Sequence, residues 1–269
     1  QSKLAKLASK FEENVLDETN NFTLNIIDDS QLDGKPEDIL ESAKSLAKEN
    51  GQKGHTFTLH FPCYVPVLQY AKNRNLRKQM YEAYAKKASE FSHKKFDNTA
   101  IIKDILSHRA SIAKLLGFNN YAELSIDRKM ANNPEEVCSF LRDLSHKAKP
   151  YGLKDFEELQ EAAKKDDIND LEAWDVAFYS EAIKQEKYSI NDQEIKQFFP
   201  ENKVIEGLFN VIKNLYGIDV VESAASVWHK DVKYYELCQN NKVIGSFYLD
   251  LYARKNKRGG AWMDECISK

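Results

Sequence analysis

Residues 243 to 252 constrain the fold more than any other stretch, because apolar and polar side chains alternate along them. One face would carry Val243, Gly245, Phe247, Leu249 and Leu251, and the other Ser246, Tyr248, Asp250 and Tyr252. Such alternation is typical of a strand with one buried face. Nearly all of the sequence before this strand has helical spacing. We therefore expect a mainly α-helical fold, a multi-helix scaffold with a small antiparallel β-sheet near the C-terminus.

This strand has predicted partners. Residues 220–221 and 232–238 also have the composition of strands, and Asn240-Asn241 fits a tight hairpin turn between the last two, because Asn tolerates a positive φ. A second, short hairpin is expected near the N-terminus. There the stretch from Phe22 to Ile27 would pair with the stretch from His55 to Phe61.

Helical spacing of apolar residues runs through most of the chain before Gly217. In the clearest case one stripe would comprise Ile101, Ile105, His108, Ile112 and Leu115. Helices are expected over residues 3–17, 35–50, 64–92 (as a pair), 98–117, 133–149, 153–165, 174–186 and 200–216. The break at Pro150 rests on the rule that a proline inside a helix interrupts it.

The change from helices to strands after Gly217 divides the chain. We expect residues 1–217 to form a helical scaffold that includes the N-terminal hairpin, and residues 218–269 to form a β-hairpin segment. No Pro-, Gly- or Ser-rich linker marks an independent second domain. A chain of 269 residues is long enough to bury a large core.

Composition excludes several classes of protein. The net charge of -3 gives no sign of binding to nucleic acid or to a membrane surface. No apolar run approaches the ~20 residues that cross a bilayer, and the first ten residues lack the features of a secretory signal. The four cysteines are far apart and form no C-x-x-C pair. This pattern favours reduced thiols in a cytoplasmic protein.

No catalytic motif is present in the sequence. H-E-x-x-H, G-x-S-x-G, the P-loop and G-x-G-x-x-G are all absent. His55 and His60 would point to opposite faces of one strand, which favours structural or surface roles. His108 fits a core position on its helix. His93 and Asp97 are spaced like two ligands of one metal but lack a third. We therefore predict no catalytic residue and no metal ligand in this chain.

Several longer patterns do point to a family. They are Phe61-Pro62-Cys63-Tyr64-Val65-Pro66-Val67, Trp174-Asp175-Val176-Ala177-Phe178-Tyr179-Ser180, Phe199-Pro200-Glu201-Asn202-Lys203 and the run from Gly245 through Trp262-Met263-Asp264. Together they resemble the thimet-type (M3) zinc oligopeptidases, in the same order and over essentially the whole chain. The last pattern resembles the segment that precedes the zinc-binding helix of that family.

The resemblance implies a zinc-dependent peptidase of the cytoplasm that admits short unfolded peptides to a deep channel, without nucleic-acid or membrane partners. In the family, an H-E-x-x-H helix and a later glutamate hold the zinc, and none of these residues occurs here. The expectation is an internal fragment, inactive alone and without zinc, from a full-length enzyme that is monomeric. Such a fragment is expected to self-associate. Two alternatives stay open: a non-catalytic helical peptide-binding or interaction module, and a dipeptidyl carboxypeptidase in place of an endopeptidase.

The predicted substrate-binding residues are Gly259, Gly260, Ala261 and Trp262. A long strand precedes them, and two glycines without side chains let another backbone approach closely. A peptide added there as an extra strand would be held mainly through its backbone, which suits an enzyme with many substrates. The alternative is that Gly259-Gly260 is only a flexible turn after the basic residues 255–258.

Overall fold

The structure, a computed structural model, describes residues 2–265, so Cys266 lies outside the described residues. The chain forms two compact units. The first comprises residues 1–186 and 258–269, and the second comprises residues 187–257. The domain boundary expected at residues 217/218, from the change of helices to strands, stays a prediction.

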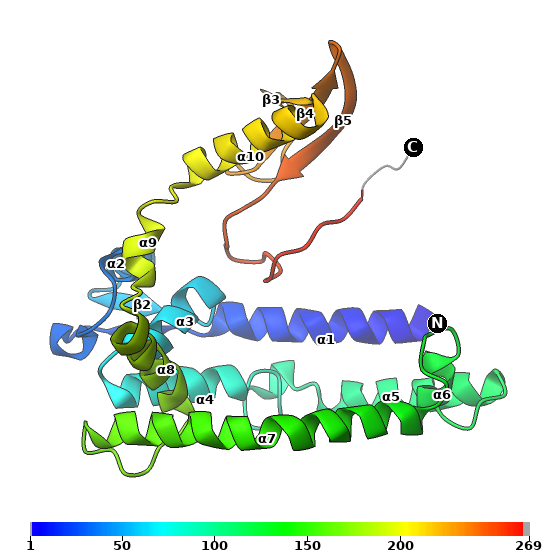
Figure 1. Ribbon diagram of the computed structural model, residues 1–269, viewed down its shortest axis with the longest axis horizontal. Helices are drawn as coiled ribbons and strands as arrows, with labels where there is room; N and C mark the ends of the chain where they lie inside the picture. Colours follow the sequence, from blue (N-terminus) through cyan, green and yellow to red (C-terminus); the bar gives the residue numbers. More distant parts are fainter. Residues whose placement is uncertain (1, 266–269) are drawn as a thin grey trace. The chain divides into compact units, whose positions relative to one another are not determined.

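Long helices make up most of the first unit. Helix α1 (Ser2–Asn21) lies beside α5 (Thr99–Leu115), as Figure 1 shows. Asn14 of α1 donates to Asn98, directly before α5, at 2.8 Å, and Asn98 donates in turn to the carbonyl of Phe11 at 3.1 Å. These buried amides fix the two helices to one another, because a buried polar group left without its partner costs free energy.

The predicted N-terminal hairpin is confirmed, with shorter strands. Strand β1 (Leu24–Ile26) pairs antiparallel with β2 (His55–Phe57), in a register that places Asn25 opposite Thr56. A short 3-10 helix, η1 (Asp29–Leu32), and α2 (Glu37–Glu49) connect the strands. The expected extension of the second strand to Phe61 is wrong, since Phe61 begins the next helix and His60 precedes it. Pro62 in that first turn favours the helix over the strand.

The main core lies where this hairpin meets two further helices. Helix α3 (Phe61–Tyr70) packs on α4 (Arg74–Ala85), and Asn73 caps α4 by accepting from the backbone N–H of Leu76. The largest fully buried apolar side chains of this core are Phe57, Leu59, Val67, Leu76 and Met80. Burial of such side chains stabilises the fold by about 1.5–3 kcal/mol each. A 3-10 helix, η2 (Lys94–Phe96), leads on to α5.

Helix α7 (Pro134–Lys164) corrects the prediction of two separate helices. Asn133 caps it, accepting from the N–H of Glu136 at 2.8 Å. The helix continues through Pro150, because the hydrogen bonds of several turns on either side outweigh the missing N–H donor and the steric clash of the ring. Helices α6 (Tyr121–Ile126) and α8 (Ala173–Tyr188) precede and follow it.

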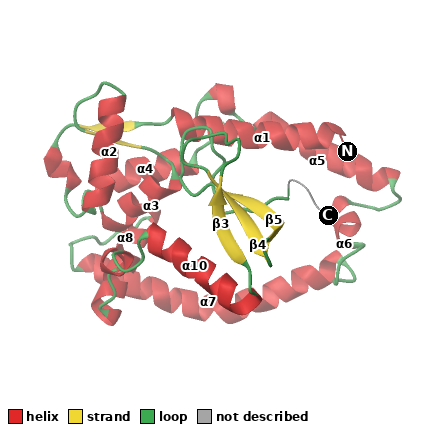
Figure 2. Ribbon diagram, turned by 90° about the horizontal axis from the view of Figure 1, so that it is seen from above, coloured by secondary structure: helices red, strands yellow, loops and turns green. Residues whose placement is uncertain are grey.

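The second unit is a three-stranded sheet with one helix on its face (Figure 2). Short helix α9 (Asp192–Lys196) and helix α10 (Glu201–Tyr216) lead into strands β3 (Asp219–Ser223), β4 (Lys233–Gln239) and β5 (Lys242–Leu249), which are antiparallel in that order. Phe209 of α10 packs on Tyr235 and Phe247, with ring centroids 5.0 and 6.5 Å away.

Residues that tolerate a positive φ form both turns of this unit. Gly217 ends α10 in the left-handed conformation with a φ of 65°, and Asn240 and Asn241 form the hairpin with φ of 51° and 62°. The predicted strand to Tyr252 is too long, since β5 ends at Leu249. A bulge also shifts the register, so that Leu237 faces Gly245 while Cys238 faces Val243.

Candidate functional site

The predicted substrate-binding residues lie in irregular backbone after the sheet. Gly259, Gly260, Ala261 and Trp262 are exposed and belong to neither a helix nor a strand. A Cβ atom added at either glycine would meet no other atom within 4 Å. Gly260 has a φ of 96°, a conformation that residues with a side chain rarely adopt, whereas Gly259 has no such restriction. The backbone of this segment is therefore open to an approaching chain.

A polar cluster fixes the residues directly before this segment. We call it the Asp250 cluster, and it consists of Trp228, Asp250, Arg254 and Lys257. The Asp250 carboxylate accepts from Arg254 Nη1 at 2.6 Å and Nη2 at 2.8 Å, from Lys257 Nζ at 3.0 Å and from Trp228 Nε1 at 3.0 Å. Four donors saturate the lone pairs of one carboxylate. The paired contact with Arg254 is the strong, two-pronged kind.

Lys257 has no donor left over. Besides the carboxylate, its ammonium group donates to the carbonyl of Asp250 at 2.7 Å and to the carbonyl of Tyr252 at 2.8 Å. A turn brings it there: Lys257 N–H donates to the carbonyl of Arg254 at 3.2 Å, and Asn256 has a φ of 65°. Asn is suited to that turn position because it tolerates a positive φ.

The neighbouring charges determine the ionisation of this cluster. The hydrogen bonds from Arg254, and then those from Lys257 and Trp228, hold the pKa of the Asp250 carboxyl well below its usual value of 3.8, against the opposing effect of burial. The same contact raises the pKa of the Arg254 guanidinium. Only 17% of the Asp250 side chain, 21% of Arg254 and 17% of Lys257 is exposed. The cluster is therefore permanently ionised near neutral pH and partly shielded from water.

The sheet and α10 support the cluster from both sides. Trp228, in the connection between β3 and β4, packs against Tyr248 of β5 with ring centroids 5.1 Å apart, and Tyr248 in turn lies 4.9 Å from Tyr234. The Tyr252 hydroxyl donates to the carboxylate of Glu201 at the start of α10. Residues 250–257 are thus attached to the second unit through several side chains, although they belong to no regular element.

Sequence reasoning assigned no role to this cluster. Asp250 fell on the polar face of the expected strand, Lys257 belonged to the basic residues 255–258, and Arg254 was given no role. The spacing D-x3-R-x2-K was a signal that could have been used. It also explains where the strand ends, because the Asp250 carbonyl bonds to Lys257.

The histidines do not gather. Nδ1 of His55 lies 3.6 Å from a carboxylate oxygen of Asp29, and Nδ1 of His229 lies 3.4 Å from Asp231. His108 is half-buried on α5, not in the core. Among residues 2–265, no three His, Cys, Asp or Glu side chains are placed to hold a metal ion. Within the same residues, no helix is long and apolar enough to span a membrane.

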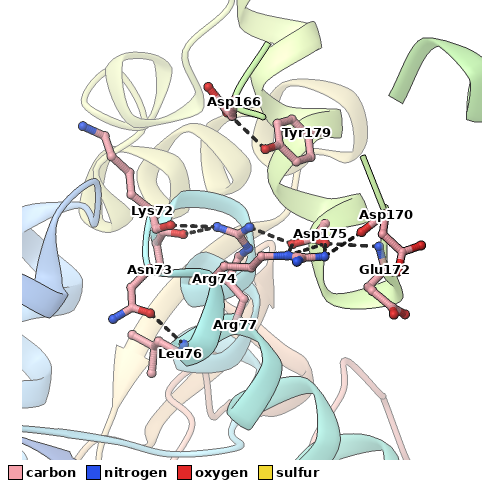
Figure 3. A network of polar contacts seen from close by, with 11 residues as sticks. Lys72, Asn73, Arg74, Leu76, Arg77, Asp166, Asp170, Glu172, Asp175 and Tyr179 are labelled. Atoms are coloured by element: carbon pink, nitrogen blue, oxygen red, sulfur yellow. Dashed lines mark hydrogen bonds and ion pairs between the residues drawn. The ribbon is translucent and has the colours of Figure 1, made fainter. Parts of the chain in front are cut away.

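A second polar network, in the first unit, is structural (Figure 3). Asp175 of α8 is fully buried and accepts from Arg74 at 2.7 Å and from Arg77 at 2.8 Å, both on α4. Arg77 also donates to the carbonyl of Ala71 at 2.7 Å. Burial by itself would raise the pKa of the Asp175 carboxyl, but the hydrogen bonds from Arg74 and Arg77 outweigh it and lower the pKa. The network fastens α8 to α4.

Comparison with known proteins identifies relatives along the entire chain. Oligopeptidase A of Haemophilus influenzae is 47% identical over 100% of this chain, and oligopeptidase A of Escherichia coli (strain K12) is 45% identical over 100% of it. Dipeptidyl carboxypeptidase of the same E. coli strain is 31% identical over 98%.

The match covers only part of each relative: the chain spans 40% of the length of both oligopeptidases and 39% of the dipeptidyl carboxypeptidase. A family model, described as Peptidase family M3, matches residues 67–269. The resemblance read from the sequence patterns is thereby confirmed, and the chain belongs to Peptidase family M3.

Proposed function

We propose that this chain is part of a zinc-dependent metallo-oligopeptidase of the cytoplasm, a hydrolase that cleaves short unfolded peptides. In this proposal the chain supplies scaffold and a wall of the substrate channel. The observation that carries it is the 47% identity to an oligopeptidase A over the full length of the chain.

The zinc of the whole enzyme is proposed to be bound outside the described residues. Residues 2–265 offer no set of three side chains that fits a zinc ion, which needs three protein ligands and a water at a catalytic site. We therefore assign no catalytic step to any residue of this chain, and we propose that the chain alone is inactive.

The proposed contact with substrate is made by residues 259–262. Their backbone is exposed, and a Cβ added at either glycine would meet no atom within 4 Å. Both observations support the addition of a peptide as an extra strand. In that arrangement the backbone binds the peptide and side chains such as Trp262 contact its residues. The alternative, a flexible turn, predicts no effect of these residues on peptide binding.

Gly259→Val in the full-length enzyme tests this proposal. Valine fits at Gly259 in the free protein, so stability should stay unchanged, whereas its side chain would obstruct an incoming backbone. The expected result is a fall in kcat/KM of at least about tenfold for every peptide. Gly260→Val is a poorer test, because its φ of 96° strains the backbone whether or not peptide binds.

The control is Ala225→Val, at an exposed position of the irregular connection between β3 and β4. It should leave both the melting temperature and kcat/KM unchanged. Unchanged kinetics in Gly259→Val would remove these residues from the substrate path.

Metal removal separates the enzyme from the alternative of an interaction module. The full-length protein should lose peptide hydrolysis on treatment with a chelator and regain it with stoichiometric zinc. Peptide binding without any chelator-sensitive hydrolysis would favour the module. Peptides with an amidated C-terminus then distinguish an endopeptidase, which cleaves them, from a dipeptidyl carboxypeptidase, which needs the free carboxylate.

A further inference from the structure

We propose that Asp250 is a positioning residue for the peptide-binding segment, and that it withdraws Arg254 and Lys257 from any contact with a substrate carboxylate. The inference rests on the proposed function of residues 259–262. The cluster would hold the backbone directly before that segment, and Arg254 and Lys257 would serve as its donors.

The connectivity of the chain is the first step. Only Arg258 separates Lys257, the last member of the Asp250 cluster, from Gly259. A chain of three residues spans at most about 10 Å, so an anchor at Lys257 restricts where Gly260 can go. Ordering a flexible segment costs conformational free energy, and a segment that is already held binds with less of that cost.

The second step is the commitment of the donors. Both Nη atoms of Arg254 bond to the Asp250 carboxylate, and the ammonium group of Lys257 makes three bonds within the cluster. A lysine has three donors in all. A peptide carboxylate could make the two-pronged contact with Arg254 Nη1 and Nη2 only by displacing Asp250, whose side chain is more than four-fifths buried, and it could bind Lys257 only by replacing one of that residue's three acceptors. The two cations therefore fix the backbone instead of binding substrate.

Asp250→Asn in the full-length enzyme is the test. The amide keeps the size of the side chain but loses its charge and one acceptor, which leaves Arg254 and Lys257 without their counter-ion. If the cluster positions the segment, KM should rise about tenfold while kcat changes by less than about threefold, because ground-state and transition-state binding are lost together. The rise should be equal for peptides with a free and with an amidated C-terminus.

The rival role for the two cations predicts the opposite sign. If they bind a substrate carboxylate in competition with Asp250, the variant would bind free-carboxylate peptides more tightly, and their KM would fall while that of amidated peptides stayed the same. That result would overturn the proposal. So would an unchanged KM for both kinds of peptide.

A spectroscopic signal shows that the cluster itself has been changed. Trp228 Nε1 donates to Asp250 at 3.0 Å, so the fluorine resonance of 5-fluorotryptophan at position 228, assigned through Trp228→Phe, should shift in Asp250→Asn. A resonance that stays in place would mean that the contact does not exist in solution, and would also overturn the proposal.

Glu222→Gln is the matched control, since it removes the same charge from an exposed pair with Lys233 (3.2 Å) on the same sheet. Its kinetics should equal those of the parent enzyme.

Trp228→Phe keeps the proposal testable if Asp250→Asn does not fold. It removes a single donor and should raise KM about twofold to threefold, again equally for both kinds of peptide. An unchanged KM in that variant would refute the proposal. Loss of activity in Gly259→Val alongside a normal Asp250→Asn would leave the proposed segment standing and reject the positioning role. A normal Gly259→Val would reject the segment itself.

Discussion

At the scale of single residues, Asp175 shows how much depends on one buried carboxylate. It holds two arginines of another helix, and Arg77 is itself only 1% exposed. Removing one partner of a buried pair leaves an uncompensated charge, which costs more than the pair contributes while intact.

Asp175→Asn should therefore lower the free energy of unfolding at pH 7 by about 3 kcal/mol. Asp143→Asn is the control, because Asp143 and Lys147 form an exposed pair at 2.7 Å whose loss should cost less than about 0.5 kcal/mol. Urea unfolding of the parent chain and both variants measures the difference. Equal effects of the two substitutions would contradict a structural role for Asp175.

The difference should also depend on pH. The folded-state pKa of Asp175 is lowered below 3.8, so its contribution is complete above that value and is lost as the pH falls through the folded-state pKa. The gap between the parent chain and Asp175→Asn should stay constant from pH 7 to pH 5 and narrow below pH 3.8. A gap that narrows on raising the pH instead would contradict this assignment.

At the scale of elements, α7 keeps its proline at a cost. Pro150 is exposed on this helix and lacks the N–H that the neighbouring turn would use. Proline in a helix interior is less favourable than alanine by about 3 kcal/mol.

Pro150→Ala should raise the free energy of unfolding by about 1–3 kcal/mol, since it restores the backbone bond and removes the ring's steric clash. Ser145→Ala, at an exposed position of the same helix, serves as the control and should change it by less than about 0.5 kcal/mol. Denaturant unfolding followed by circular dichroism measures both. A loss of stability in Pro150→Ala would mean that the helix depends on a kink at the proline.

Elements with local signals were predictable from the sequence. Asn133 caps α7, Gly217 ends α10 and Asn240-Asn241 turns the hairpin because each acts on its own few neighbours. The error at the end of β5 has a tertiary cause. The end of β5 at Leu249 depends on side chains up to eight residues further on, and on Trp228 from another connection. Apolar periodicity does not encode such contacts, and the spacing D-x3-R-x2-K does not indicate Trp228, so the complete Asp250 cluster became visible only in the structure.

At the scale of the whole molecule, large apolar side chains are exposed in rows. On α7 they include Val137, Phe140, Leu141 and Leu144, and on α10 they include Val204, Leu208, Val211 and Leu215. Monomeric proteins rarely leave such contiguous surfaces in water. The chain spans 40% of the length of its oligopeptidase relatives, and we propose that the rest of the enzyme covers these rows.

The chain expressed alone should consequently self-associate at micromolar concentration, as measured by light scattering. Replacing Leu141 and Leu144 by Lys should reduce the association without loss of helical signal, because both side chains are more than half exposed. Gln160→Lys is the control. It adds a positive charge to the same helix without removing an exposed apolar side chain, so it should leave association unchanged. A monomer throughout the concentration range would contradict the expectation.

The order of the two units along the chain has a consequence for biosynthesis. The second unit, residues 187–257, is inserted into the first, which resumes at Arg258. Units of this kind fold as the chain leaves the ribosome, N-terminal parts first. All residues of the sheet and of the Asp250 cluster are therefore translated before the glycines at 259 and 260. The first unit, with the segment that is proposed to receive peptides, can be completed only after the whole second unit has been made.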